Sequence, residues 1–362
     1  MKKTIATLLA VLLCFGLTAC TQPNPASGDN DEEYKILGET SAPPVESKSS
    51  ETVGIKNPLT GLYDLSSSAK DNRPTALMIN NVDVAQSVQT GLDQADIVYE
   101  TYVEGGITRL LAVFKDIKKV DKLGTIRSAR VPFAELAAGH DGMYVHAGID
   151  PTYCEPFLKK RSADNVNLNS GSANTFTMRE KNGKAYEHTL YTTGEKLTSC
   201  FESLKRRTKV KDSFAGDWQS FNSPDSPRAL SSGAASSVKV PMSAQYVSGF
   251  SYNAESKKYE KSQNGNPHKD CQTGKAISFD NVFVLFSTIQ LMPDQKHVKT
   301  LLSSGEGFYI SKGAYEKISW KKGDTDTPLK LLKSDGAALD VNAGNSWICF
   351  ADKNIKTSVS VS

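Results

Sequence analysis

The sequence has 362 residues, with 43 Lys and Arg against 40 Asp and Glu, and a formal net charge of +3. Two lysines belong to an amino-terminal export signal, and segment 21–56 holds seven acidic and three basic residues, which leaves about +5 on the remainder. This small excess argues against a dedicated nucleic-acid binder, so no nucleic acid is expected among the partners. The roughly 300 residues that follow exceed the usual size of one core, so two domains are expected.

Residues 1–19 have the pattern of a lipoprotein signal peptide, because two lysines precede an apolar stretch that is too short to span a bilayer. The string Leu-Thr-Ala stands directly before Cys20, as in the lipobox of bacterial lipoproteins. The sequence therefore predicts diacylglycerol, with palmitate as a typical chain, on the sulfur of Cys20. The expected location is the extracytoplasmic face of the cell membrane, with the lipid as the membrane partner.

The next segment, 20–56, is rich in Ser, Pro, Gly and acidic residues and cannot bury enough apolar surface to fold, so it is expected to be a disordered tether. The remainder divides at 201–237, which is first basic and then rich in Ser and Pro, as a linker would be. We therefore expect an amino-terminal domain over 57–200 and a carboxy-terminal domain over 238–362.

The first domain is predicted to mix strands and helices. Residues 73–80 form an apolar run typical of a buried strand, and 97–103 and 107–114 are expected to pair as a hairpin. The turn is predicted to be the two residues Gly105 and Gly106, which places Tyr102 directly opposite Arg109. In this register Glu100, Glu104 and Arg109 share one face, and the opposite face is core.

A helix over 129–138 is predicted after the hairpin, with Ser128 as its N-cap and Pro132 in its first turn. A strand over 143–148 follows, so the helix is expected to be a crossover between strands, and 154–163 form a second helix. The segments 250–261, 277–290, 307–320 and 345–352 alternate apolar and polar residues between turns, which predicts a smaller, β-rich second domain. The fold class is therefore α+β.

Several strings recur in the order found in one family: NPLTGL (57–62), RPTALMINN, ADIVYETYVEGGITR, GTIRSAR, YEHTLYTT (186–193), NPHKDC, FDNVFVLF and AGNSWI. In these strings the chain resembles the YerB-like lipoproteins of Gram-positive bacteria, which are built around a domain of unknown function and an associated carboxy-terminal domain. The resemblance implies two domains and supplies no reaction. Thr189 stands where the family pattern usually has asparagine.

The strongest candidate site combines Glu100, Glu104 and Arg109 with the segment that holds Arg127, Ser128 and Arg130. A helix start and paired guanidinium groups suit a phosphate or a carboxylate. The alternative is an ion-pair network that only fixes the fold. Both interpretations stay open, because perturbed charges gather in either setting.

Three further polar residues, His188, His268 and Asp270, belong to the recurring strings and occupy loop-like positions, so they are candidate ligand contacts. The His, Asp and Glu spacings match no metal signature, and neither a metal nor a cofactor is expected. Cys154, Cys200, Cys271 and Cys349 are expected to be free and buried. The basic run 205–211 either faces solvent or contacts an anionic surface.

The function predicted on these grounds is a binding or scaffold module for an anionic envelope ligand or an envelope protein. The alternative is an envelope hydrolase that acts on a glycan or a phosphate ester. In this alternative Glu100 or Glu104 would act as the acid or the base. Arg109 beside them would keep both carboxylates ionised, which argues against this alternative.

Overall fold

The computed structural model describes residues 54–161 and 164–362. The predicted signal peptide, Cys20 and nearly all of the tether lie outside these residues. Within the described part no helix has the length and apolarity needed to cross a membrane. Residues 52–362 form one compact unit.

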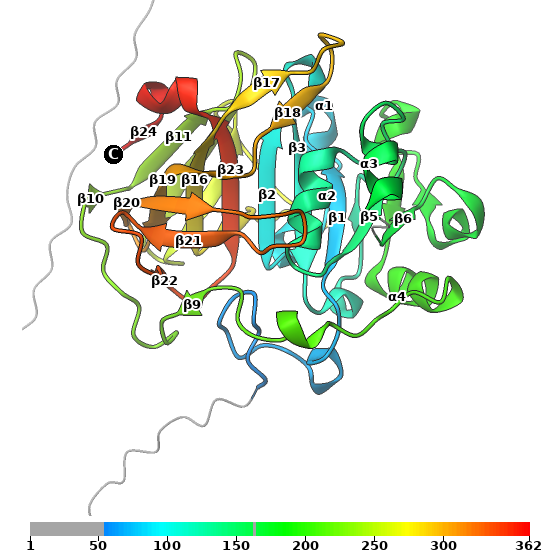
Figure 1. Cartoon of the computed structure of the whole chain (residues 1–362), viewed down its shortest axis with the longest axis horizontal. Helices are drawn as coiled ribbons and strands as arrows, with labels where there is room; N and C mark the ends of the chain where they lie inside the picture. The colour runs from blue at the N-terminus through cyan, green and yellow to red at the C-terminus, as the bar shows by residue number, and fades with distance from the viewer. Residues whose placement is uncertain (1–53, 162–163) are drawn as a thin grey trace, which may run out of the picture. The chain divides into compact units, whose positions relative to one another are not determined.

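A mixed sheet of eleven strands runs through both halves of the sequence (Figure 1). Its strands, in spatial order, are β10 (Gly233–Ala234), β20 (Ala314–Lys321), β19 (Ser304–Ser311), β16 (Asn281–Ser287), β23 (Ser346–Asp352), β2 (Ile97–Tyr102), β3 (Thr108–Phe114), β1 (Thr75–Asn80), β5 (Met143–His146) and β6 (Asn165–Asn167), with β21 (Lys330–Lys333) paired to β20. The strand β23, from the end of the chain, is parallel to both β2 and β16. The two halves therefore share a sheet across the expected boundary at 201–237.

A second sheet packs on one face of the first. It comprises β14 (Asn266–Pro267), β13 (Lys258–Gln263), β12 (Val247–Asn253), β11 (Ser237–Pro241) and β24 (Ser360–Val361), with β15 (Ser278–Phe279) paired to β13. The smaller sheets are β17 (Ile289–Leu291) with β18 (Val298–Thr300), β22 (Asp340–Val341) with β9 (Ser220–Phe221), and β4 (Leu123–Gly124) with β8 (Leu190–Thr192) and β7 (Met178–Arg179).

The helices of the described part are short. The α-helices are α1 (Asp83–Gln86), α2 (Val131–Ala138), α3 (Cys154–Lys160) and α4 (Gly194–Ser203). The 3₁₀ helices are η1 (Ser67–Ala69), η2 (Leu92–Gln94), η3 (Glu104–Gly106), η4 (Ile117–Lys119), η5 (Gly171–Phe176), η6 (Tyr186–His188), η7 (Asp212–Phe214) and η8 (Lys353–Ser358). Together with the sheets they confirm the α+β class.

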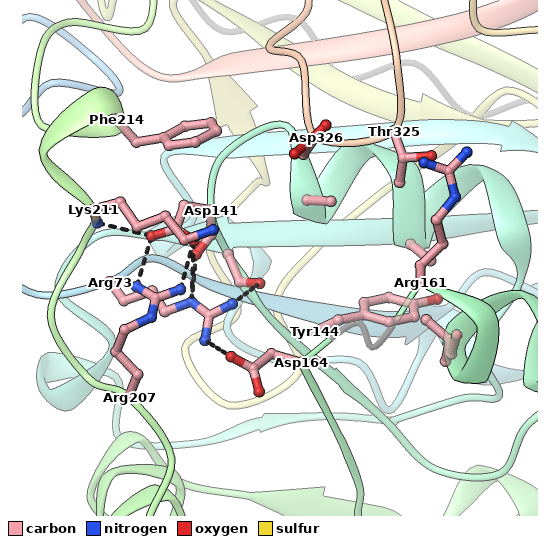
Figure 2. Close-up of a pocket in the computed structure, with 14 residues that line it drawn as sticks. Arg73, Asp141, Tyr144, Arg161, Asp164, Arg207, Lys211, Phe214, Thr325 and Asp326 are labelled. Atoms are coloured by element: carbon pink, nitrogen blue, oxygen red, sulfur yellow. Dashed lines mark hydrogen bonds and ion pairs between the residues drawn. The ribbon is translucent and has the colours of Figure 1, made fainter.

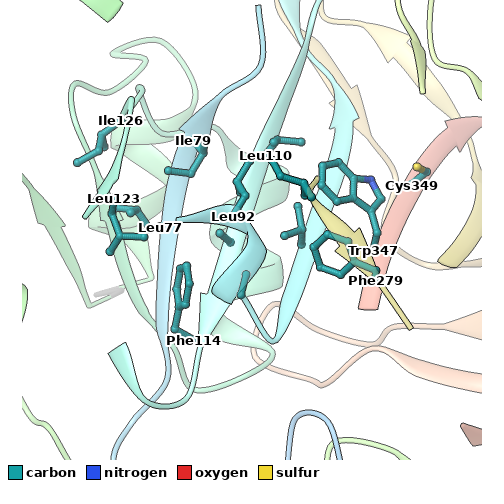
Figure 3. Close-up of a cluster of buried hydrophobic side chains, with 14 of the residues drawn as sticks. Leu77, Ile79, Leu92, Leu110, Phe114, Leu123, Ile126, Phe279, Trp347 and Cys349 are labelled. Carbon is teal, nitrogen blue, oxygen red and sulfur yellow. The ribbon is translucent and has the colours of Figure 1, made fainter. Parts of the chain in front are cut away.

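Both faces of the main sheet are buried. One face packs against the second sheet and α4, and Figure 3 shows Leu77 and Leu110 on the same side of the sheet as Trp347 and Phe279. The other face packs against α2 and α3 through residues such as Phe133. Because both faces are covered, the central strands β1, β3, β16 and β23 are continuous apolar runs rather than alternating ones.

The predicted hairpin is present, but its register is wrong by one residue. Thr101, and not Tyr102, lies opposite Arg109. The reason is a longer connection than the two-glycine turn: η3 forms between the strands, and the Val103 amide donates to the Ile107 carbonyl at 2.9 Å. A shift of one residue moves every side chain of a strand to the other face. Consequently Glu100 shares its face with Leu110, whereas Arg109 points to the opposite face.

Two further details differ from the sequence predictions. The helix α2 begins at Val131, with Arg130 and not Ser128 at its N-cap, because the preceding residues are held in extended form by β-type hydrogen bonds. Cys271 is exposed, whereas Cys154, Cys200 and Cys349 are buried, and all four are free. The parallel connection in this half runs from β5 through α3 to β6.

Candidate anion-binding site

The segment 124–130 is inserted between β1 and β5, where these parallel strands diverge. The Arg127 amide donates to the Met78 carbonyl at 3.1 Å, and the Ala147 amide donates to the Arg127 carbonyl at 3.0 Å. The segment therefore lies at the carboxyl ends of β1 and β5. In open sheets with parallel strands this is the edge at which ligands usually bind.

A close approach of backbone to side chain fixes the middle of this segment. A Cβ atom on Gly148 would lie 2.8 Å from the Ser128 hydroxyl oxygen, and Gly148 has a φ of +85°. Glycine satisfies both conditions at little steric cost. The loop after β5 can therefore pack directly on Ser128.

The guanidinium group of Arg109 meets the same edge from β3. Arg109 lies opposite Asn80 at the end of β1, and it is 5% exposed. Its Nη1 donates to the Ser128 carbonyl at 3.0 Å, and its Nη2 lies 3.4 Å from Glu104 Oε1. Arg109 thus connects the hairpin to the inserted segment.

Glu104 is shared between two arginines. Besides Arg109 it binds Arg130, whose Nε lies 2.9 Å from Glu104 Oε2 and whose Nη2 donates to Oε1. The Nη1 of Arg130 donates to the Ala129 carbonyl at 2.7 Å. We call Arg109, Arg127 and Arg130 with Glu104 the arginine cluster.

The arginine cluster carries more positive charge than its own carboxylate neutralises. Within residues 54–161 and 164–362, Glu104 is the only carboxylate that forms an ion pair with these three guanidinium groups. Arg127 donates through Nη1 to the Glu187 carbonyl at 3.3 Å. The Nε atoms of Arg109 and Arg127 are buried and have no partner among the described residues. Such unpartnered buried donors are costly and are rare in folded proteins.

Burial sets the electrostatics of this cluster. It lowers the pKa of Arg109 to about 10, and the neighbouring charge of Arg127 acts in the same direction. Burial also lowers the pKa values of Arg127 and Arg130 below the ordinary arginine range. An anion at this position would favour the charged forms and would reverse these shifts.

His188 lies at the border of the arginine cluster. Its Nδ1 is 2.8 Å from the side-chain amide nitrogen of Asn80, which is the last residue of β1 and lies at the same edge. Burial lowers the pKa of His188, and the positive charge of Arg127 lowers it further. A neutral imidazole at this position adds no charge to the cluster. The adjacent Thr189 donates its hydroxyl to the Tyr186 carbonyl at 2.8 Å.

Glu100 lies apart from the arginine cluster, on the opposite face of the sheet. It is fully buried and accepts hydrogen bonds from the Ser248 hydroxyl at 2.7 and 2.8 Å and from the Thr108 hydroxyl at 2.9 Å. The Trp347 indole also donates to it, at 3.0 Å. Glu100 and Glu104 therefore do not face a common substrate. They cannot serve together as the acid–base pair of a hydrolase.

His268 and Asp270 form a third group, which joins the second sheet to the loop before β2. The Nε2 atom of His268 bonds to the side chain of Gln89, and Asp270 Oδ2 accepts from the Gly91 amide at 2.7 Å. Burial lowers the pKa of His268 to about 3, and the nearby charge of Lys261 contributes. Both residues are engaged with protein groups away from the arginine cluster.

The basic run 205–211 belongs to a separate ion-pair network, which Figure 2 shows around Asp141. Arg207 binds Asp141 through two bonds of 2.7 and 2.6 Å, and Arg73 binds Asp164 at 2.6 Å. Lys211 lies 3.7 Å from Asp141. Here each of these cations pairs with Asp141 or Asp164, whereas Arg127 of the arginine cluster forms no ion pair among the described residues.

The sequence analysis overlooked Lys261, a buried lysine in β13. Its Nζ donates to the Ser262 carbonyl at 2.6 Å and lies 5.1 Å from the centre of the Trp347 ring. Burial lowers its pKa, and the charge of Glu100 opposes this shift. The signal was present in the alternation of β13, because Lys261 occupies the same inward-facing phase as Tyr259 and Gln263.

The described residues offer neither a metal cluster nor an activated cysteine. No group of three or more His, Cys, Asp or Glu side chains within them is arranged to hold a metal ion. Burial raises the pKa of Cys154 to about 12, which suppresses the thiolate that a nucleophile needs. The arginine cluster offers guanidinium donors, whose planar geometry suits carboxylate and phosphate groups.

Comparison with known proteins identifies the family. Residues 59–207 match the amino-terminal domain, and residues 238–348 the carboxy-terminal domain, of a protein of unknown function, DUF3048. The chain is 28% identical over 299 residues to the putative lipoprotein YerB of Bacillus subtilis, covering 81% of this chain and 85% of that protein. The crystal structure of YerB from the same organism matches with a TM-score of 0.71 and 26% identity, over 85% of this chain and 99% of the other. The chain therefore belongs to the YerB-like lipoprotein family and carries both DUF3048 domains.

Proposed function

We propose that the chain is a lipid-anchored protein of the extracytoplasmic membrane face that binds an anionic envelope ligand at the arginine cluster. The observation that carries this proposal is the imbalance of charge, since Arg109 and Arg130 share one carboxylate and Arg127 forms no ion pair among the described residues. Two buried Nε atoms without a partner add to it. Phosphate and carboxylate groups match the planar donor geometry of arginine and would satisfy these atoms.

The anchor and the location rest on other observations. The lipobox before Cys20 supports attachment to the membrane, and the name of the YerB relative agrees with it. The composition of segment 21–56 supports a flexible connection to the folded part. A binding domain held in this way would meet polyanionic polymers of the envelope, or acidic segments of envelope proteins, close to the membrane.

The proposed site keeps the residues that meet at the ends of β1 and β5: Glu104, Arg109, Arg127, Ser128, Arg130 and His188. It leaves out Glu100, His268 and Asp270, because each is bonded within the interior away from this edge. Glu104 acts as the group that positions Arg109 and Arg130. Arg127, which has no carboxylate partner, is the residue most available to a ligand.

The test is calorimetric titration of the full chain, purified in detergent, with poly(glycerol phosphate) and with an acidic peptide. Arg127→Gln removes a charged donor without breaking an ion pair, so we expect the affinity to fall about tenfold to a hundredfold, the worth of a charged hydrogen bond. Arg206→Gln, in the basic run 205–211, removes the same charge elsewhere and should change the affinity by less than about threefold.

The two variants separate specific binding from general charge attraction. Equal losses in Arg127→Gln and Arg206→Gln would mean that the anion binds through net charge alone and would remove the arginine cluster from the account. No binding of either probe to the unmodified chain would contradict the proposal altogether. Unfolding curves of each variant check that the fold is retained.

A further inference from the structure

A cavity of about 310 Å³ lies beside the arginine cluster, between α2, α3 and the hairpin of β17 and β18. Its apolar lining includes Tyr153 and Phe157 from the start of α3 and Val298 from β18. Apolar and aromatic walls with a few polar groups are typical of small-molecule sites. This volume lies at the lower end of the range for small-molecule sites, which is about 300 to 1,000 Å³.

The wall formed by the hairpin is fixed by His297. Its Nε2 lies 3.2 Å from Asp150 Oδ1, its Nδ1 lies 2.6 Å from Asp294 Oδ2, and the ring of Tyr153 packs edge-on against it at 5.3 Å. Asp150 in turn accepts the backbone amide hydrogen of Cys154 at the start of α3. A site whose walls are already ordered loses less entropy when a ligand binds.

Arg130 belongs to both the cavity and the arginine cluster. It lines the cavity, and the same guanidinium group holds Glu104 beside Arg109. A ligand whose anionic group binds the cluster would therefore extend its remaining atoms into this cavity.

The polar groups of the cavity point to a hydroxylated ring rather than to a purely aromatic one. Arg130 and Lys299 offer donors, whereas Glu135 offers a carboxylate acceptor. A hydroxyl group both donates and accepts, so a ring with several hydroxyls can use both kinds of partner. Tyr153 and Phe157 provide the flat apolar surface for the ring itself.

We propose that this cavity binds the sugar ring of an anionic saccharide whose phosphate or carboxylate lies at the arginine cluster. This inference rests on the proposed function and names the class of its ligand. Sugar phosphates and sugar acids both combine a hydroxylated ring with an anionic group. Titration with one compound of each class distinguishes them.

The experiment is calorimetric titration of the full chain in detergent with glucose 6-phosphate, glucuronic acid, glucose and inorganic phosphate. We expect glucose 6-phosphate or glucuronic acid to bind at least tenfold more tightly than inorganic phosphate, and glucose to bind weakly. The charged sugar that binds more tightly identifies the source. In Val298→Phe the added ring fills the cavity, so the advantage of the charged sugar should disappear while inorganic phosphate still binds.

The control is Val84→Phe, the same substitution at a position that is 56% exposed and outside the cavity lining. It should keep the preference for the charged sugar. Equal affinities for phosphate and charged sugars in the unmodified chain, or a preference that survives in Val298→Phe, would overturn this inference and leave the proposed function intact. If neither inorganic phosphate nor a charged sugar binds, this inference fails, and the titration with poly(glycerol phosphate) and the acidic peptide decides the proposed function.

Discussion

Glu100 is a carboxylate with no access to solvent, and its neighbours explain how the interior tolerates it. Hydroxyl and indole groups from Thr108, Ser248 and Trp347 donate to its two oxygens. The ammonium group of Lys261 is buried in the same interior, and the charge of Glu100 favours its protonated form. Such a network is stable only while both charges are present.

We therefore predict that Glu100→Ala lowers the free energy of unfolding by about 3 to 5 kcal/mol, because it leaves Lys261 buried without a counter-charge. Denaturant unfolding of the full chain measures this loss. The matched control is Glu306→Ala, which removes a carboxylate that pairs with Lys356 on the surface and should cost about 1 kcal/mol or less. Similar losses in both variants would contradict the role assigned to the buried pair.

At the scale of single residues, the sequence predicted the arginine cluster better than the buried network. Arg127 and Arg130 are only three positions apart, beside a predicted helix start. Their proximity could therefore be inferred from the local sequence. Glu100 meets Ser248 and Lys261 only because two sheets pack face to face, and no local pattern contains that contact. The sequence shows a charged residue within a strand, but it does not show which residues bind that charge.

At the scale of elements, the hairpin of β2 and β3 decides which charges meet. The sequence predicted the two strands and the glycine turn, but not the register, because the Gly-Gly pair is compatible with more than one turn length. The structure uses η3, in which Gly105 has a φ of +75°. The longer turn places Arg109 on the face of Thr101 and leaves Glu100 on the other face.

The turn can be tested at Gly105. A side chain at a φ of +75° is strained even though no atom lies within 4 Å of the added Cβ, so Gly105→Ala should lower the free energy of unfolding by about 1 to 2 kcal/mol. Gly216→Ala is the control, since that position is equally open and has no positive φ. Thermal or denaturant unfolding compares the two. An equal effect would mean that the turn does not need the left-handed conformation.

At the scale of the whole molecule, β23 joins the two halves by pairing with β2 on one side and β16 on the other. The composition becomes basic and then rich in Ser and Pro at 201–237, and the two family domains divide there as well. Neither observation contains the pairing of β2 with β23, which joins residues about 250 positions apart, such as Glu100 and Cys349. Long-range strand order of this kind cannot be read from local periodicity.

This sheet predicts a single cooperative unfolding transition for the described part of the chain. Scanning calorimetry should give equal calorimetric and van't Hoff enthalpies. A fragment that ends at residue 237 should fail to fold, because β2 would lose its neighbour β23. Two separate transitions, or a folded fragment with native circular dichroism, would show that the halves are independent despite the shared sheet.

The central claim is that the arginine cluster is an anion site, and the most direct measurement is diffraction from crystals soaked in tungstate, a phosphate analogue with a strong anomalous signal. We expect an anomalous tungsten peak at the arginine cluster, with tungstate oxygens within about 2.7 to 3.2 Å of a guanidinium nitrogen of Arg109 or Arg127. We also expect this peak to be absent in Arg127→Gln. A peak confined to the basic run 205–211, or no peak at the cluster, would contradict the account and leave these arginines as part of the fold alone.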